Sequence, residues 1–133
     1  MKPVGGLKMN KKIEENQMEE LLGLAVECMG VAVTITDTKG IVLYYNKHAA
    51  KILDRKPEYI GKDSHSHHKK AATNEKFDLM LQAFEEGRTE PFHYEAKPYG
   101  KILFVTLSPM IKDGHFVGCV QSVQLKEEIM PEE

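Results

Sequence analysis

The sequence contains no tryptophan and only two cysteines, Cys28 and Cys119. Two cysteines are too few for a disulfide framework. Because neither stands in a CxxC or CxxCH motif, a zinc knuckle or covalently attached haem is not expected. Few cysteines without a disulfide pattern are typical of a reducing compartment, so we expect the protein to be cytoplasmic.

Long apolar runs are also missing. No segment approaches the ~18–20 apolar residues that span a bilayer, and no apolar stretch follows the first twelve residues to make a signal peptide. Lys and Arg number 18 against 20 Asp and Glu, which gives a net charge of −2. A chain without basic excess is a poor general nucleic-acid binder. We therefore expect neither membrane insertion nor a nucleic-acid partner.

Catalytic signatures are absent as well. The chain has no G-x-S-x-G, H-E-x-x-H or Walker A motif, and the paired carboxylates Glu85 and Glu86 fall at the end of an expected helix. Its 133 residues suffice for one domain but not for a TIM barrel or a two-domain dehydrogenase. A single domain without enzymatic activity is the prediction.

The N-terminal region predicts an amphipathic helix whose apolar face must pack against another surface. Residues 1–10 show little hydrophobic pattern and are interpreted as a mobile lead-in, whereas residues 11–30 predict an amphipathic helix that stops at Gly30. Its apolar positions recur at spacings of three and four, and they are Met18, Leu21, Leu22, Ala25, Val26 and Met29. Such a stripe must pack on its own domain or on a second copy. The expected dimerisation residues are Met18, Leu21, Leu22, Ala25 and Met29.

Residues 31–125 predict one α+β domain, in which alternating β-branched runs indicate strands and apolar residues at helical spacing indicate helices. Asn46 suits the N-cap of a short helix, and Asp113-Gly114 is a strong hairpin signal. The expected strands cover residues 31–38, 41–46, 91–97, 101–110 and 116–125; the expected helices cover residues 47–54, 57–60 and 77–86; residues 126–133 form an acidic tail.

This order of elements predicts a five-stranded antiparallel sheet with helices on one face. The side chains expected to pack between sheet and helices are Ile35, Leu43, Ile52, Leu53, Phe77, Leu81, Phe104, Val105, Val117 and Val120. A one-residue error in strand register would move a whole set to the other face.

Several short motifs follow one another along this domain. They are Ile35-Thr36-Asp37 with Gly40, Val42 through Asn46, Ala49-Ala50, Ile52-Leu53, Tyr59-Ile60-Gly61, and the closing hairpin around Asp113-Gly114 with Gly118. In this order and at these spacings the sequence resembles a PAS domain over roughly residues 24–125. The resemblance implies the sheet order 2-1-5-4-3, with helices that cover the concave face and enclose a small pocket.

PAS domains sense small ligands, haem, flavin or redox state, or serve only for dimerisation. A flanking N-terminal helix commonly lies at their dimer seam, so the resemblance implies a homodimer. A separate effector protein is a further candidate partner. A closer likeness is to the PAS modules of hemerythrin-like or DUF438-type proteins, which often carry Cys-His-Pro shortly after the Ile-Gly. Here His68 stands at the position of that histidine, without the Cys or the Pro.

Three of the six histidines, His65, His67 and His68, lie within four residues. Imidazole is a common ligand of iron, zinc, copper and nickel. His67 or His68 is therefore a candidate axial ligand of haem, and the three histidines together are a candidate metal site. Lys69 and Lys70 could meet haem propionates. The alternative interpretation is a solvated polar loop.

Two further sets of residues are candidates for the wall of a ligand pocket. On the expected helix of residues 77–86, these are Phe77, Met80 and Phe84; on the last strand they are Cys119 and Gln121. An apolar helical stripe is usually core, and Met80 is a conceivable second haem ligand although a packing role is commoner. A buried Cys119 would be an inert small side chain. Flavin photochemistry is not expected, because the reactive-cysteine segment of light-sensing PAS domains is absent.

The leading hypothesis from the sequence is a PAS sensor or interaction module that binds a small ligand between its sheet and helices and signals through a dimer or a partner. The runner-up is the same fold with haem, sensing gas or redox state through a histidine axial ligand. The third is a ligand-free dimerisation module. The identity of any ligand or cofactor stays open at this point, with haem as a candidate.

Overall fold

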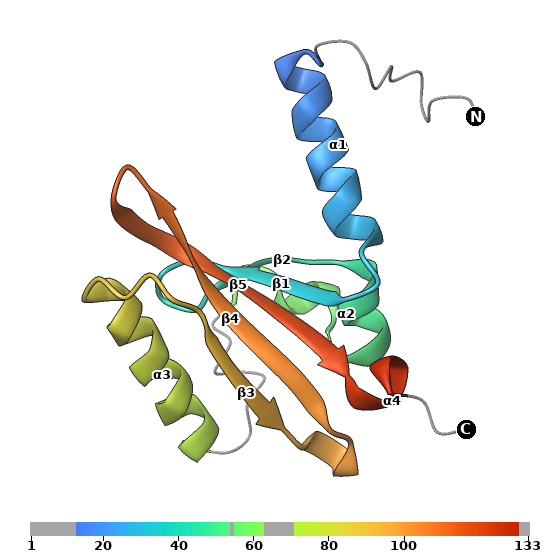
Figure 1. Ribbon diagram of the computed structural model, residues 1–133, viewed down its shortest axis with the longest axis vertical. Coiled ribbons are helices and arrows are strands. Elements are labelled where there is room, and N and C mark those ends of the chain that lie inside the picture. The colour runs from blue at the N-terminus through green and yellow to red at the C-terminus, as the bar shows by residue number, and fades with distance from the viewer. Residues whose placement is uncertain (1–12, 54, 63–70, 131–133) are drawn as a thin grey trace.

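The computed structural model describes residues 13–53, 55–62 and 71–130 (Figure 1). The chain order is α1 (Glu15–Cys28), β1 (Ala32–Thr36), β2 (Val42–Tyr45), α2 (Lys47–Ile52), η2 (Pro57–Tyr59), α3 (Ala71–Glu85), β3 (Phe92–Ala96), η4 (Pro98–Gly100), β4 (Leu103–Lys112), β5 (His115–Leu125) and α4 (Lys126–Ile129). All five strands join one sheet in the order β2-β1-β5-β4-β3, and every neighbouring pair is antiparallel. The predicted fold and strand order are confirmed.

Local chemistry explains two of the hairpins. After β1, a carboxylate oxygen of Asp37 accepts hydrogen bonds from the backbone N–H groups of Lys39 and Ile41, both at 2.9 Å, which closes the turn into β2. Between β4 and β5, Asp113 and Gly114 have φ angles of 50° and 78°. Positive φ at both central residues matches the right-handed twist of the flanking strands, so the Asp-Gly prediction is confirmed.

Gly118 has a different reason to be glycine. Its φ is 155°, and a Cβ at this position would collide with the backbone oxygen of Thr36 and with the side chain of Met110. The close approach of β5 to the end of β1 therefore depends on the missing side chain.

The core lies between the inner face of the sheet and the helices, in two clusters. The first is on the side of α2 and contains Ala32, Ala49, Leu103, Val105, Val123 and Leu125. The second is on the side of α3 and contains Phe77, Met80, Leu81, Phe84, Leu107 and Cys119. The burial of Phe77, Leu81 and Val105 was predicted correctly, and Ile52 and Leu53 pack half-buried against the first cluster.

Leu43 and Val117 were wrongly predicted to face the helices, since they are 52% and 44% exposed. The register of the β1–β2 pair shifts between Ile35 and Thr36, so that Val42 pairs with Thr36 and is buried in place of Leu43. A second irregularity separates Met110 from Ile111 close to Val117. Bulges of this kind change which residues face inward.

Ile35, Phe104 and Val120 were also expected between sheet and helices, and they lie on the outer face instead. Ile35 pairs with Val120, and both alternate with inward-facing residues of their strands; Phe104 stands between the buried Leu103 and Val105. Because strand side chains alternate with a period of two, these three point away from the helices.

Two helix predictions need correction. α3 begins at Ala71 rather than at Phe77; its first six residues, Ala-Ala-Thr-Asn-Glu-Lys, contain no large apolar side chain and so show no apolar period. Residues Lys126–Ile129 of the expected tail form the short helix α4. In contrast, α2 begins directly after Asn46, whose side chain accepts from the backbone N–H of Ala49 as expected of an N-cap.

α1 stands apart from the rest of the fold. Figure 1 shows it rising away from the sheet with only its C-terminal end against the body, and none of its residues is buried. Met18, Leu22 and Met29 are 39%, 57% and 43% exposed, and Leu21 is half-buried. The apolar stripe therefore does not lie across its own sheet, which was one of the expected arrangements.

Candidate ligand-binding site

Between the two apolar clusters, the inner face of the sheet carries hydrogen-bonding side chains. Thr34 on β1 lies opposite Gln121 on β5, and Thr34 is only 3% exposed. The guanidinium of Arg55 spans the pair, with its Nε donating to Thr34 Oγ1 at 3.3 Å and its Nη2 donating to Gln121 Oε1 at 3.1 Å. Tyr94 on β3 also hydrogen-bonds with the side chain of Gln121. These four residues are called the central polar group below.

Three of the four residues of the central polar group are held by strands of the sheet. Thr34, Gln121 and Tyr94 come from β1, β5 and β3, and the strand ladder fixes their spacing. Arg55 follows α2, and its backbone N–H donates to Leu53 O at 2.8 Å. Side chains fixed in this way lose little entropy when a ligand binds them.

Two cations approach this part of the sheet. The guanidinium of Arg55 belongs to the central polar group, and Lys76 Nζ lies 4.7 Å from the centre of the Tyr94 ring. Burial raises the pKa of Tyr94, although the hydrogen bond with Gln121 opposes the shift. Tyr94 is therefore a neutral phenol at physiological pH.

One wall of the site is the apolar face of α3. Phe77, Met80 and Phe84 are 6%, 6% and 2% exposed. The Phe84 ring lies 5.3 Å from Phe92 and 5.6 Å from Phe116 between centroids, with tilted planes. These three predicted ligand-binding residues are thus brought together beside the sheet, and each also packs in the core.

Cys119 is fully buried at the junction of β5 with β1. Burial raises the pKa of its thiol to about 12, against a smaller lowering by its hydrogen bond to Thr36. Since only the thiolate is a good nucleophile, Cys119 is unreactive at neutral pH. Cys119 therefore contributes to the site only as a small, buried apolar side chain that fills space.

The histidine cluster lies outside the described residues. His65, His67, His68 and the adjacent Lys69 fall within residues 63–70, so their roles as haem or metal ligands remain predictions. Within residues 13–53, 55–62 and 71–130, no group of three or more His, Cys, Asp or Glu side chains is placed to hold a metal ion.

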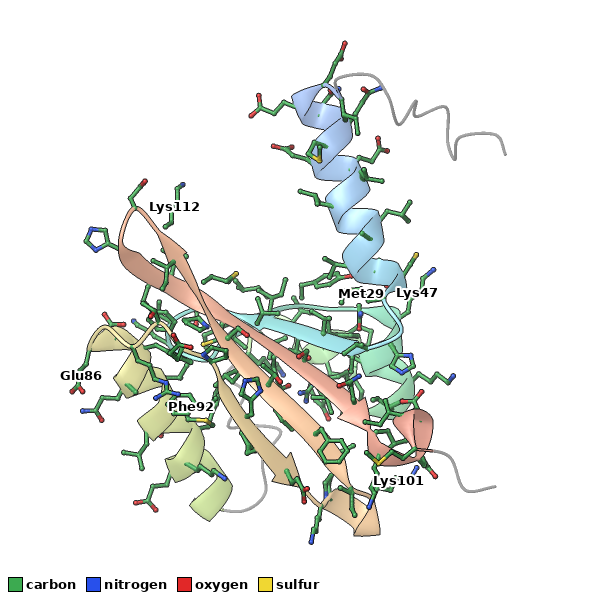
Figure 2. The ribbon with its side chains drawn as sticks, viewed as in Figure 1. Met29, Lys47, Glu86, Phe92, Lys101 and Lys112 are labelled. Atoms are coloured by element: carbon green, nitrogen blue, oxygen red, sulfur yellow. The ribbon has the colours of Figure 1, made fainter. Side chains whose placement is uncertain are left out.

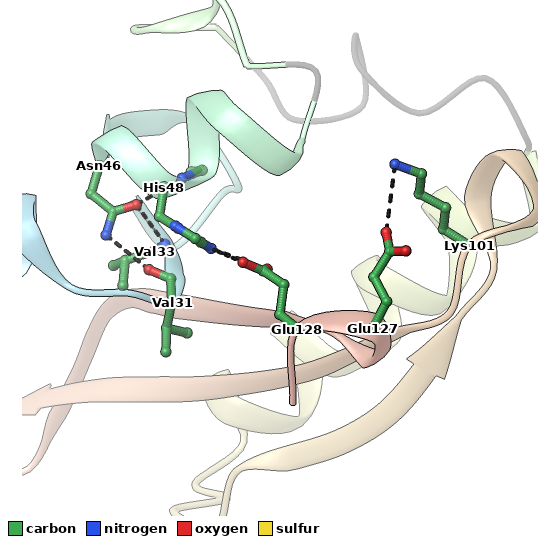
Figure 3. A network of polar contacts seen from close by, with 8 residues as sticks. Val31, Val33, Asn46, His48, Lys101, Glu127 and Glu128 are labelled. Atoms are coloured by element: carbon green, nitrogen blue, oxygen red, sulfur yellow. Dashed lines mark hydrogen bonds and ion pairs between the residues drawn. The ribbon is translucent and has the colours of Figure 1, made fainter. Parts of the chain in front are cut away.

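A second polar centre lies where the helices meet the sheet (Figure 3). The side chain of Asn46 is 1% exposed and makes four hydrogen bonds. Its Oδ1 accepts from the backbone N–H groups of Val33 and Ala49, and its Nδ2 donates to the carbonyls of Val26 and Val31, all at 2.9–3.0 Å. One amide therefore joins α1, β1 and α2.

Neighbouring side chains add to this junction. The hydroxyl of Tyr44 donates to Glu27 of α1 at 2.7 Å; burial, followed by this hydrogen bond and the charge of Glu27, raises the pKa of Tyr44 to about 12. His48 on α2 contacts the Glu128 carboxylate of α4 at 3.1 Å, and Lys101 lies 3.9 Å from Glu127 (Figure 3). α2 thus contacts both the N-terminal and the C-terminal helix.

The sequence reasoning named Gln121 but missed Thr34, Arg55 and Tyr94. Thr34 alternates with apolar residues in β1 and reads as an ordinary strand residue. Arg55 lies among other charged residues, where a solvated side chain is the default expectation. Only knowledge that β1 and β5 are neighbours, which the resemblance supplied, could have directed attention to Thr34 beside Gln121.

An antiparallel sheet in the order 2-1-5-4-3 with helices on one face is the arrangement of the PAS fold. The family model described as "PAS domain" matches residues 24–124. The chain therefore belongs to the PAS domain family, whose members are sensor and signalling modules. The comparisons concern the family as a whole, so the narrower likeness to modules of hemerythrin-like proteins stays a prediction.

Solved structures agree on the fold. A C-terminal domain from Streptococcus mutans is 21% identical with a TM-score of 0.66, and the match covers 96% of this chain and 93% of that one. The PAS domain of BvgS from Bordetella pertussis is 13% identical with a TM-score of 0.64, covering 80% and 84%. The phage VqmA–DPO complex is 19% identical with a TM-score of 0.63, covering 86% and 56%. A comparison with curated proteins found no match.

Among the described residues, no helix combines the length and the apolar character needed to cross a membrane.

Proposed function

We propose that this PAS domain is a non-enzymatic sensor that binds a small ligand between its sheet and α3. The observation that carries the proposal is the central polar group, in which a guanidinium, an amide, a hydroxyl and a phenol converge between two apolar clusters. Apolar walls with a few fixed polar groups are typical of small-molecule sites. That VqmA was solved with DPO is further support from a protein of the same fold.

The charge suggests the chemistry of the ligand. Arg55 and Lys76 place positive charge on this side of the sheet, and guanidinium groups bind carboxylates or carbonyl oxygens well. A small apolar molecule with an acidic or carbonyl group would direct that group toward Arg55 and lay its apolar part against Phe77, Met80 and Phe84. Gln121 would orient it by hydrogen bonding, and Cys119 would border it.

Native mass spectrometry of the purified full chain tests this proposal. We expect a fraction of the protein to carry a small non-covalent adduct, and Arg55→Gln to lose at least about 90% of it, as removal of a charged hydrogen bond of ~1.5–3 kcal/mol implies. Arg88→Gln is the matched control, because the Arg88 guanidinium lies 3.8 Å from the centre of the Phe92 ring and donates to the carbonyls of Glu90 and Pro91 instead of to Thr34 or Gln121. The absence of any adduct in the wild type would favour the ligand-free dimerisation module.

Haem is the second candidate, and the histidine cluster at residues 65–68 is the observation that favours it. Titration with haemin should then give a Soret band that His67→Ala or His68→Ala shifts or abolishes, and His65→Ala would show whether a third imidazole takes part. His93→Ala is the control, since His93 on β3 hydrogen-bonds to Thr106 at 3.0 Å. A spectrum identical to that of free haemin would rule haem out.

The signal would pass through a homodimer or to a separate effector protein. We propose that the dimer interface is formed by one stripe on α1, made of Met18, Leu21, Leu22, Ala25 and Met29. A stripe this exposed is uncommon on a helix that has no partner. The double variant Leu21→Glu/Leu22→Glu should run as a monomer in light scattering. Asn16→Glu/Gly23→Glu places the same two charges seven residues apart on the opposite face and should leave the dimer intact. A wild type that is monomeric at high micromolar concentration would contradict the seam.

A further inference from the structure

We propose that α1 pairs with the α1 of a second copy in the antiparallel direction, and that the acidic start of the partner helix lies beside Lys47 and Lys51 on α2. The inference rests on the homodimer of the proposed function and specifies its orientation. It follows from the position of α1, the distribution of charge along it, and the basic residues at its base.

The charge on α1 is of one sign. Residues 13–29 contain five glutamates, Glu14, Glu15, Glu19, Glu20 and Glu27, and no Lys or Arg. Four of the five lie at the N-terminal end: Glu14 is the N-cap, and Glu15, Glu19 and Glu20 are in the first half of the helix. A parallel pair would bring the four carboxylates of one copy beside the same four of the other, and like charges in register repel. An antiparallel pair places the two acidic halves at opposite ends.

The base of α1 offers the complementary charge. The start of α2 lies next to the last turn of α1. Asn46, the N-cap of α2, donates from its Nδ2 to Val26 O of α1 at 2.9 Å. Figure 2 labels Met29, which follows α1, and Lys47, the first residue of α2, at this base. Lys47 and Lys51 are exposed, and α2 contains no acidic residue. A partner helix that runs antiparallel would start near these two lysines.

The apolar seam fits the same arrangement. The midpoint of α1 lies between Leu21 and Leu22, so a two-fold axis there places Leu21 opposite the partner's Leu22 and Met18 opposite the partner's Ala25. At 1.5 Å per residue the 14-residue helix is about 21 Å long, which lets the partner's Glu15 reach the level of Cys28 and Lys47. Antiparallel helix dipoles also attract rather than repel.

Disulfide trapping tests the direction on the full chain. Cys28 is exposed and is first changed to Ser. Cys119 is buried and will not form an intermolecular disulfide. One chain then carries Met18→Cys and the other Ala25→Cys, and the two are mixed and oxidised. An antiparallel pair should give mainly the mixed disulfide between positions 18 and 25, at least about tenfold over the disulfides between identical positions. Disulfides only between identical positions would overturn the antiparallel inference and leave the dimer standing.

A second measurement does not depend on cysteine geometry. Lys47→Glu/Lys51→Glu should weaken the dimer about tenfold in sedimentation equilibrium at low salt, and Glu15→Lys/Glu19→Lys in the partner chain should restore it. Lys112→Glu, at the tip of the β4–β5 hairpin (Figure 2), is the control. Unchanged affinity in the α2 variant contradicts the inference alone, whereas a wild type without self-association removes the dimer and its orientation together.

Discussion

Replacement of Phe84 by alanine is expected to lower the free energy of unfolding by about 3–5 kcal/mol. Phe84 is 2% exposed and is among the largest fully buried side chains. Its ring packs between Phe92 of β3 and Phe116 of β5, so a cavity there would face two strands that cannot close it without breaking their ladder. Urea unfolding followed by circular dichroism measures the effect.

Phe77→Ala should behave in the same way, because Phe77 belongs to the same cluster and is 6% exposed. Leu79→Ala is the matched control on the same helix: Leu79 is 61% exposed, so its loss should change stability by less than about 1 kcal/mol. A small effect at Phe84 would mean that α3 does not pack on the sheet through this face.

The order and kind of the elements were predictable because each follows from local chemistry. Asn46 caps α2, Asp37 closes one turn, and Asp113-Gly114 supplies the positive φ angles of the other. The facing of individual strand residues was less predictable. It depends on the bulges beside Thr36 and Ile111, which arise from strand pairing and have no signature in the local sequence.

The candidate site also has one part that was predictable from the sequence and one part that was not. The apolar wall from α3 was predictable from the helical spacing of Phe77, Met80 and Phe84. The central polar group was not, because Thr34, Arg55 and Gln121 come from three segments and meet only in the folded sheet. Polar residues that alternate with apolar ones in a strand look solvent-exposed until the covering helices are placed.

α2 connects the candidate site with both ends of the domain. Arg55 of the central polar group is the third residue after it, Asn46 before it holds the end of α1, and His48 within it contacts Glu128 of α4. A ligand that moved Arg55 would therefore act on a segment that touches both terminal helices. Allosteric coupling requires such an element with contacts to both sites.

Replacement of Asn46 by alanine is expected to cost roughly 3–5 kcal/mol of stability. The change leaves Val33 N–H and Ala49 N–H without an acceptor, and the carbonyls of Val26 and Val31 without a donor. Each buried polar group left unsatisfied costs about 1–3 kcal/mol, and loss of the α2 N-cap alone costs about 1 kcal/mol. Partial relaxation and water entry keep the total below the sum.

Because two of these bonds hold α1 and its connection to β1, the same variant should also free that helix. Hydrogen exchange should therefore rise in α1 beyond the change in global stability. Asn16→Ala, at an exposed site whose side chain accepts from the backbone N–H of Gln17, should leave both unchanged. Asn46→Asp distinguishes the accepting oxygen of the amide from its donating nitrogen. The variant keeps an acceptor for the N–H groups of Val33 and Ala49, but it places a carboxylate oxygen against the carbonyls of Val26 and Val31. Burial there favours the protonated acid, so the pKa of this carboxyl in the folded state should lie above the usual value of about 4. The variant should then be most stable below pH 4 and lose stability as the pH rises through the raised value. An Asn46→Ala protein with wild-type stability and an unchanged α1 would show that the amide is not the junction between the helix and the domain.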